Sequence, residues 1–255
     1  MSGYRILPGA GRRRTAVRLC DFAILTFDCY GTLIDWERGI CDALAPWLAR
    51  HASGVGEEHL LALFAAWESA EQRATPGAPY PRILERVMYR IGESLGLEVR
   101  AEEAEAFGAS VGNWPPFPDT VQALAYLREH FPLAVLSNVD RASFARSQAL
   151  LGVAFDFLFT AEDIGSYKPD PRNFRWMVDR LAEAGIPRQG ILHVAQSLFH
   201  DILPARKAGL ATCWIDRRAG RPGGATPAVE EQVRPDFRFE SLAGLVEAHR
   251  REMAA

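Results

Sequence analysis

The chain has 255 residues, of which 48% are hydrophobic and 24% charged, and its formal net charge is −3 at pH 7. These values are typical of a globular protein with one compact core and an inserted smaller domain. The slightly negative charge gives no sign of binding to nucleic acid or to an anionic membrane surface. No apolar run approaches the 20 residues that a membrane span needs, so neither a nucleic acid nor a membrane is expected as a partner.

The amino-terminal segment, residues 1–19, contains three consecutive arginines at positions 12–14 with no apolar run after them. A signal peptide needs such a run, so we expect a basic, disordered tail. The four cysteines, at positions 20, 29, 41 and 213, lack the paired spacing of a zinc site. Free cysteines suit a reducing compartment, and a cytoplasmic location is expected.

The carboxyl-terminal two thirds alternates between apolar runs and helical patterns. Strands are expected at 132–136, 155–160, 190–195 and 211–215, and helices at 120–130, 141–151, 171–184 and 203–209. With a first strand ending near residue 27, this alternation predicts a parallel sheet with right-handed crossovers. We therefore expect an α/β fold, a Rossmann-like core built from residues 20–36 and 116–250.

Between these two core segments the apolar spacing becomes helical. Leu60, Leu63, Phe64 and Trp67 follow one helical stripe, and a second stripe runs from residue 83 to 91. Residues 37–115 are therefore predicted to form an all-helical cap domain. The proline-rich segment 114–118 returns the chain to the core, and Asp119 or Thr120 is expected to cap the next helix. Residues 217–234, rich in Gly and Pro, are expected to form a surface loop.

Polar side chains follow the expected strands at four places. Asp28 ends the first strand, before Gly31 and Thr32; Ser137 and Asn138 end the second. Lys168 lies in a Tyr-Lys-Pro-Asp turn, and Gln196, Ser197 and Asp201 follow a buried strand. Because the carboxyl ends of parallel strands share one edge, these groups are expected to converge on one crevice. A fixed carboxylate such as Asp28 can act as a nucleophile, with the Thr32 hydroxyl holding one of its oxygens.

The order of these blocks resembles that of the haloacid dehalogenase superfamily of hydrolases. Within it, Asp28-x-Tyr30-Gly-Thr-Leu is similar to the motif of the 2-haloacid dehalogenases. Phosphatases of the superfamily carry an acid at the position of Tyr30, which protonates the leaving alcohol; a departing halide needs no proton. Gln196 stands where a magnesium-dependent phosphatase usually has Asp, so neither a metal nor another cofactor is expected.

The resemblance implies roles for several of these residues. Asp28 attacks carbon and forms an ester, Lys168 pairs with it, Ser137 assists, and Asp201 directs the water that hydrolyses the ester. Tyr30, Thr32, Asn138, Gln196 and Ser197 line the substrate site. His200 is a substitute base, although a partly exposed turn position is the expectation for it, and His193 is expected to be a core residue. The substrate would be a short halogenated carboxylic acid. A homodimer is a further possibility that the sequence does not decide.

One departure from the family pattern concerns the cap. The 2-haloacid dehalogenases have an arginine after a tryptophan on the second cap helix, which binds the substrate carboxylate or the halide. Glu68 follows Trp67 at that place. Another cation is therefore expected to approach Asp28: first Arg73, or else Arg82, Arg86 or Arg90. If no such arginine approaches Asp28, a simple 2-haloacid is no longer the favoured substrate.

The family's Tyr six residues after the Lys is Phe174, and Gln196 and Leu198 replace the Ser and Asn of its fourth block. Two other functions stay open on this sequence. One is a magnesium-dependent small-molecule phosphatase with the metal on Asp28, the Tyr30 carbonyl and Asp201. The other is a non-catalytic binding module.

Overall fold

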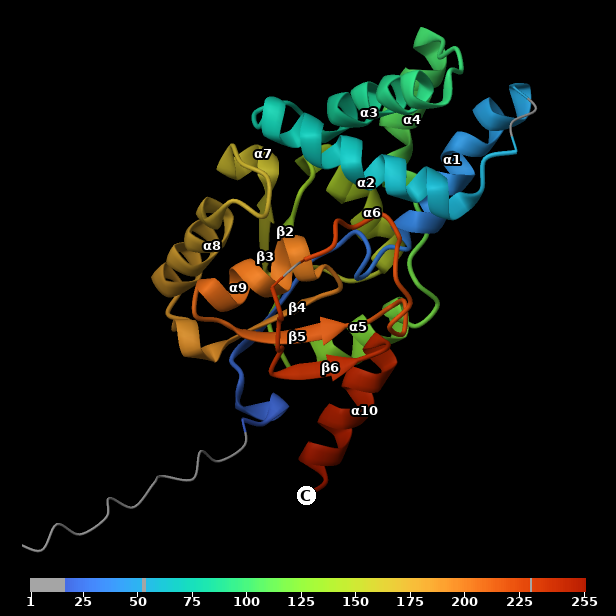
Figure 1. Ribbon diagram of the computed structural model, residues 1–255. Coiled ribbons are helices and arrows are strands. Elements are labelled where there is room, and N and C mark those ends of the chain that lie inside the picture. Colours follow the sequence, from blue (N-terminus) through green and yellow to red (C-terminus); the bar gives the residue numbers. More distant parts are fainter. Residues whose placement is uncertain (1–16, 52–53, 230) are drawn as a thin grey trace, which may run out of the picture.

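The computed structural model describes residues 17–255 apart from residues 52, 53 and 230. Its centre is a six-stranded sheet of order β3-β2-β1-β4-β5-β6 in which every neighbouring pair is parallel (Figure 1). The strands are β1 (Ile24–Phe27), β2 (Leu133–Ser137), β3 (Phe157–Thr160), β4 (Ile191–Ala195), β5 (Ala211–Ile215) and β6 (Phe237–Phe239). The predicted parallel α/β core is confirmed.

Helices cover both faces of this sheet, and alternate strand residues pack against opposite layers. Ile24 belongs to a core cluster with residues of α8 (Pro171–Glu183) and α9 (Leu203–Lys207). Leu25 belongs to the larger cluster on the other face, with α5 (Thr120–Arg128), α6 (Arg141–Leu151) and α10 (Leu242–Met253). Because both faces are covered, every residue of β1, β2 and β4 is buried.

The segment between β1 and α5 carries a group of helices. It contains α1 (Trp36–Arg50), α2 (Glu57–Ala74), α3 (Tyr80–Leu95) and α4 (Ala101–Ser110), which pack together over one end of the core (Figure 1). Aromatic rings of α1, α2 and α4 meet edge to face at Phe64, which lies between Trp36 and Phe107. A short helix, α7 (Ala161–Ile164), follows β3. We call α1 to α4 the cap.

Three details correct the sequence-based expectations. The edge strand β6 and helix α10 were not predicted. Leu19 is buried at the start of a 3₁₀ helix (Leu19–Asp21), so the core begins inside the segment expected to be a tail; residues 1–16 of that segment lie outside the described residues. Asp119 does not cap α5 with its side chain, because its carboxylate accepts from Arg217 and from the backbone of Ala243.

Other sequence-based expectations agree with the structure. The described part of segment 217–234 contains neither helix nor strand. Gly209 follows α9 with a φ of +79°, as expected for the residue that ends a helix. Among the described residues, no helix is both long and apolar enough to span a membrane.

Candidate active site

The turn after β1 holds Asp28 in one position. Gly31 adopts a φ of +93°, and a side chain there would lie 2.9 Å from Trp36 Nε1, so glycine is the residue that fits. The chain then folds back, and Thr32 Oγ1 donates to Asp28 Oδ2 at 2.7 Å. The same hydroxyl accepts from the backbone N–H of Gln196 at 2.9 Å, which directs its single proton at Asp28.

Lys168 links the two carboxylates of the site. Its ammonium donates to Asp28 Oδ1 at 2.8 Å, to Asp201 Oδ1 at 2.6 Å and to the carbonyl of Leu136 at 2.9 Å. These three bonds use all three ammonium protons. Burial lowers the pKa of Lys168, but Asp201 and Asp28 outweigh that effect and the net shift of its pKa is upward. The lysine is therefore charged and held in place.

The two carboxylates respond differently to this shared cation. Burial raises the pKa of Asp28; Lys168 opposes the rise and Asp201 adds to it. For Asp201, Lys168 and His193 overcome the effect of burial and lower its pKa. Asp201 is thus the carboxylate that stays ionised most readily.

Asn138 positions the lysine through the backbone. Its Oδ1 accepts from Lys168 N at 2.6 Å, and its Nδ2 donates to the carbonyl of Lys168 at 3.0 Å. These two bonds tie the end of β2 to the loop that carries Lys168. The side chain lines the pocket as expected, but both ends of its amide are occupied by protein.

A π-helix (Leu198–Ile202) carries the fourth block after β4. Ser197 begins it, accepting from His200 N at 2.8 Å and lying 3.3 Å from His200 Nδ1. Helices of this kind are short and concentrated at functional sites. His200 is buried, not partly exposed as expected, and burial lowers its pKa to about 4. It is therefore neutral at physiological pH.

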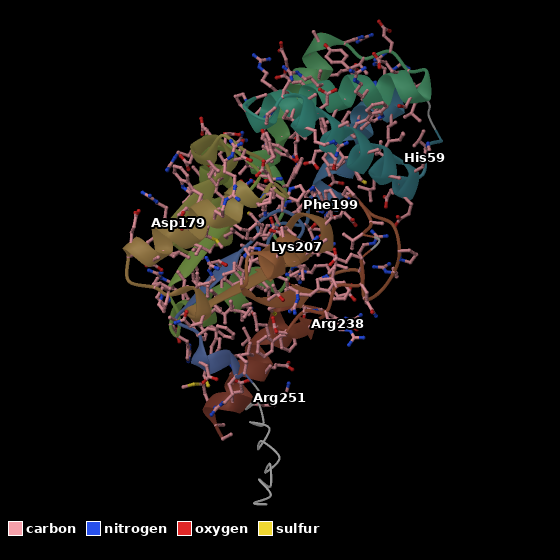
Figure 2. All side chains as sticks on the ribbon, turned by 60° about the vertical axis from the view of Figure 1, so that its left-hand side comes forward. His59, Asp179, Phe199, Lys207, Arg238 and Arg251 are labelled. Atoms are coloured by element: carbon pink, nitrogen blue, oxygen red, sulfur yellow. The ribbon has the colours of Figure 1, made fainter. Side chains whose placement is uncertain are left out.

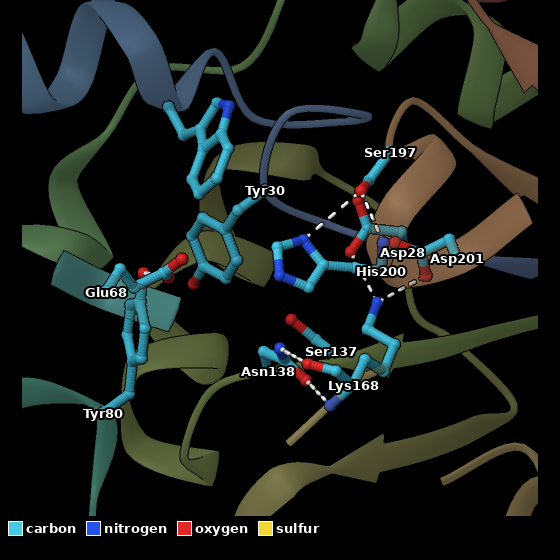
Figure 3. Close-up of a pocket in the computed structure, with 11 residues that line it drawn as sticks. Asp28, Tyr30, Glu68, Tyr80, Ser137, Asn138, Lys168, Ser197, His200 and Asp201 are labelled. Carbon is cyan, nitrogen blue, oxygen red and sulfur yellow. Dashed lines mark hydrogen bonds and ion pairs between the residues drawn. The ribbon is translucent and has the colours of Figure 1, made fainter. Parts of the chain in front are cut away.

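These residues enclose one small pocket between the sheet edge and the cap (Figure 3). The space between these residues has a volume of about 30 Å³. Three buried polar atoms of its lining have no hydrogen-bond partner: Ser137 Oγ, His200 Nε2 and Glu68 Oε2. Buried polar atoms are normally paired, so these three are the groups best placed to contact a small ligand. The pocket is lined by Asp28, Tyr30, Trp36, Glu68, Tyr80, Ser137, Asn138, Lys168, Ser197, His200 and Asp201.

The cap contributes Glu68 and Tyr80 to this pocket. Glu68 lies on α2 at the position where the resemblance places an arginine, and it is buried. Tyr80, at the start of α3, donates to Glu68 Oε1 at 2.7 Å. Burial raises the pKa of Glu68 to about 7, with a further contribution from Asp28. Glu68 thus lines the pocket around Asp28, at the place where the sequence put it.

The expected replacement cation is not in the pocket. Arg73 is exposed and lines a neighbouring cavity that shares Lys168 and His200 with the pocket. Arg82 pairs with Glu85, Arg86 donates to Thr75, and Arg90 pairs with Glu71 and Glu93. Among the residues that the structure describes, no arginine lines the pocket around Asp28. The prediction of a cap arginine facing Asp28 was wrong.

Tyr30 and Gln196 also differ in their roles from the expectation. Tyr30 lines the pocket, but its hydroxyl is 2.8 Å from Ser147 Oγ and its ring packs edge to face on Trp114. The side chain of Gln196 does not line the pocket; its Oε1 lies 3.4 Å from Thr226 Oγ1, in a cavity beside it. That cavity is bordered by Phe199, which lies beneath the cap (Figure 2). Gln196 serves the site through its backbone N–H.

Two further residues support the site. The sequence did not single them out for this purpose. His193 Nε2 lies 3.1 Å from Asp201 Oδ1, and its Nδ1 lies 3.0 Å from Thr26 Oγ1. Arg217 donates to the carbonyl of Thr32 through Nη2 at 2.8 Å and pairs with Asp119. His193 is a buried core residue, as expected, but it also orients Asp201. Arg217 holds the turn after Asp28 by the carbonyl of Thr32, a contact that chain order alone did not indicate.

The position of Lys168 between the two carboxylates also decides how well the site fits a magnesium ion. A magnesium ion on Asp28 and Asp201 would need their oxygens, yet the Lys168 ammonium stands between the two carboxylates. Among the described residues, no group of three or more His, Cys, Asp and Glu side chains is arranged to hold a metal. A hard dication takes several oxygen ligands, so this donor set fits magnesium poorly.

The family model for haloacid dehalogenase-like hydrolases matches residues 22–209. The chain belongs to this family. The match spans the turn that holds Asp28, the helices α1 to α4 and the π-helix. The chain is therefore a haloacid dehalogenase-like hydrolase.

Individual relatives of this hydrolase include two kinds of enzyme. It is 28% identical over 219 residues to an (S)-2-haloacid dehalogenase of Pseudomonas putida, covering 81% of this chain and 92% of the relative. It is 29% identical over 204 residues to a phosphoserine phosphatase of Thermus thermophilus, covering 77% and 75%. The crystal structure of a defluorinating L-2-haloacid dehalogenase superposes with a TM-score of 0.74 at 20% identity, covering 92% of this chain and all of the other. That structural match supports the fold.

Proposed function

We propose that this hydrolase cleaves the carbon–halogen bond of a short 2-haloacid or of a close derivative of one through an ester on Asp28. Because no arginine of the described residues lines the pocket, the derivative is favoured over the free acid. The observation that carries the proposal is the placement of Asp28, which lines a small pocket while Thr32 and Lys168 each hold one of its oxygens. A carboxylate fixed in this way can attack a carbon atom without reorienting.

In the first step, an oxygen of Asp28 attacks the carbon that bears the halogen. A carbon–oxygen bond forms, the carbon–halogen bond breaks, and the halide leaves with the bonding electron pair. No proton is needed for this departure, which is consistent with Tyr30 at a position where the phosphatases carry an acid. Lys168 remains paired with Asp201 as the charge on Asp28 is consumed.

In the second step, water attacks the carbonyl carbon of the Asp28 ester. The bond between that carbon and the ester oxygen breaks, and the product leaves as an alcohol after its oxygen receives the proton that the water gave up. Two groups in the pocket can take the proton of that water: Asp201, oriented by His193, and His200, whose Nε2 has no protein partner. Ser137 Oγ, also unpartnered, is a donor available to the substrate or to the departing halide.

A panel assay tests this function. Purified protein is given short 2-chloro- and 2-bromoacids, the matching amides, and p-nitrophenyl phosphate, each with and without excess chelator. The expected result is release of halide that persists in chelator, with little release of phosphate. Release of phosphate alone, and only with added magnesium, would overturn the proposal in favour of a phosphatase.

A further inference from the structure

Glu68 is a buried carboxyl group in the pocket that the proposed reaction does not use. Its Oε1 accepts from Tyr80, whereas its Oε2 is buried without a partner. A buried polar atom without a partner is costly, and it gains most from a ligand that supplies one. Glu68, Asp28 and Lys168 line the same cavity of about 30 Å³, so a small ligand there contacts the cap and the core together (Figure 3).

The charged groups that face this cavity are predominantly acidic. Asp28 and Asp201 share the single cation Lys168. His200 is neutral at physiological pH because burial lowers its pKa to about 4. No further cation lines the cavity within the described part of the chain. The pocket thus carries a net charge of about −1 with Glu68 protonated and about −2 with Glu68 ionised, and it repels a carboxylate in either state.

This charge balance has a consequence for the substrate, which rests on the proposed function. We propose that Glu68 makes the pocket select a 2-halo compound whose second polar group is a hydrogen-bond donor, a carboxamide or an ammonium group, where a 2-haloacid has its carboxylate. An N–H of either group satisfies Glu68 Oε2. The Ser137 hydroxyl, also unpartnered, is free to donate to the carbonyl oxygen of an amide.

Tyr80 makes Glu68 a directed acceptor. The tyrosine hydroxyl holds Oε1 at 2.7 Å, and both side chains are almost completely buried. The lone pairs of Oε2 are then available to a donor in the cavity. A site built around buried hydrogen-bonding groups rejects an analogue that leaves them unpaired, and it does so more strongly than an apolar site rejects a change of size.

The experiment measures binding of three halogen-free probes, so that it does not depend on turnover: propionamide, isopropylammonium and propionate. Dissociation constants are determined near pH 8, where Glu68 is mostly ionised, for the wild type, Glu68→Gln and Glu71→Gln. Glu71 is the matched control, because it lies on the same helix but pairs with Arg90 away from the pocket. Comparing the dissociation constants of propionamide and isopropylammonium shows whether a neutral or a cationic donor is preferred.

We expect propionamide or isopropylammonium to bind at least about tenfold more tightly than propionate to the wild type. Glu68→Gln should reduce that ratio by about tenfold or more, and Glu71→Gln should leave it unchanged. Propionate binding as tightly as both donors, or a ratio that Glu68→Gln leaves unchanged, would overturn the inference.

The panel assay separates this outcome from failure of the proposed function. Release of halide from 2-chloropropionate in preference to 2-chloropropionamide, together with equal binding of the probes, overturns the selectivity but leaves the carbon–halogen reaction standing. A clear preference for donor probes without release of any halide supports the role of Glu68 and overturns the reaction.

Discussion

The ammonium of Lys168 donates to the carboxylate of Asp28 across 2.8 Å, in a place where both side chains are almost completely buried. The same ammonium binds Asp201 and the carbonyl at position 136, so it has no proton left for another acceptor. Lys168 therefore acts as a fixed positive charge that orients Asp28 and balances one of the two carboxylates.

Replacing this lysine tests its role in the reaction. Lys168→Met removes the charge but keeps most of the volume, and kcat for halide release should fall about a thousandfold or more, which corresponds to about 4 kcal/mol. The free energy of unfolding should also fall by about 3–5 kcal/mol, because two buried carboxylates lose their shared partner. Circular dichroism confirms that the variant is folded. A kcat within tenfold of the wild type would show that the charge is dispensable.

Thr32 offers a second test with a matched pair of variants. Thr32→Val removes the hydroxyl that donates to Asp28 and accepts from Gln196 N, whereas Thr32→Ser retains it. Thr32→Val should lower kcat about 10- to 100-fold and the stability by about 1–3 kcal/mol, because the N–H of Gln196 loses its acceptor. Thr32→Ser should stay close to the wild type in kcat and in stability. Equal effects of the two substitutions would mean that the methyl group matters and the hydroxyl does not.

Asp201 and His200 are the two candidates for directing the water of the second step. Asp201→Asn should slow hydrolysis of the ester more than its formation, so that a covalent adduct on the peptide containing Asp28 accumulates and is detected by mass spectrometry. His200→Gln should leave no adduct if Asp201 is the base. An adduct that accumulates only in His200→Gln would assign the role to the histidine.

The sequence predicted the strands β1 to β5, and with them the convergence of the four blocks, because apolar runs and Gly-containing turns are local signals. Asp28, Thr32 and Lys168 were predicted together, with their contacts, because parallel strands bring their carboxyl ends to one edge. The prediction of a cap arginine facing Asp28 was wrong because an arginine on a cap helix can form its ion pairs away from the pocket. Arg90, for example, pairs with Glu71 and Glu93. Such pairings depend on tertiary contacts that periodicity does not encode.

The supporting residues were missed for a related reason. His193 lies in the middle of a buried strand, where the sequence gives no sign that its ring reaches Asp201. Arg217 follows β5 and contacts a turn 185 positions earlier in the chain. Burial of His200 was also unforeseen, since the π-helix that turns it inward has no simple sequence pattern.

Glu68 makes the stability of the protein depend on pH. Its pKa is about 7 in the folded chain against an ordinary value of 4.5, so the folded state binds more protons between these two values. The contribution of Glu68 to the free energy of unfolding is therefore full below about pH 4.5 and falls as the pH rises to about 7. Glu68→Gln lacks this loss and should gain stability relative to the wild type across that window, by about 3 kcal/mol in total.

Chemical denaturation at a series of pH values measures this difference. A difference between Glu68→Gln and the wild type that is constant from about pH 4.5 to about pH 7 would mean that Glu68 titrates normally in the folded protein.

The central claim is that Asp28 forms a covalent bond to the substrate, and a single turnover in oxygen-18 water tests it directly. Enzyme in excess over the best 2-halo substrate of the panel is allowed to react once, and both the product and the peptide containing Asp28 are analysed by mass spectrometry. Because the product oxygen comes from the carboxylate and water then restores that carboxylate, the label should appear on Asp28 and not in the product. Label found in the product after one turnover would mean that water attacks the substrate itself, and would contradict the covalent mechanism.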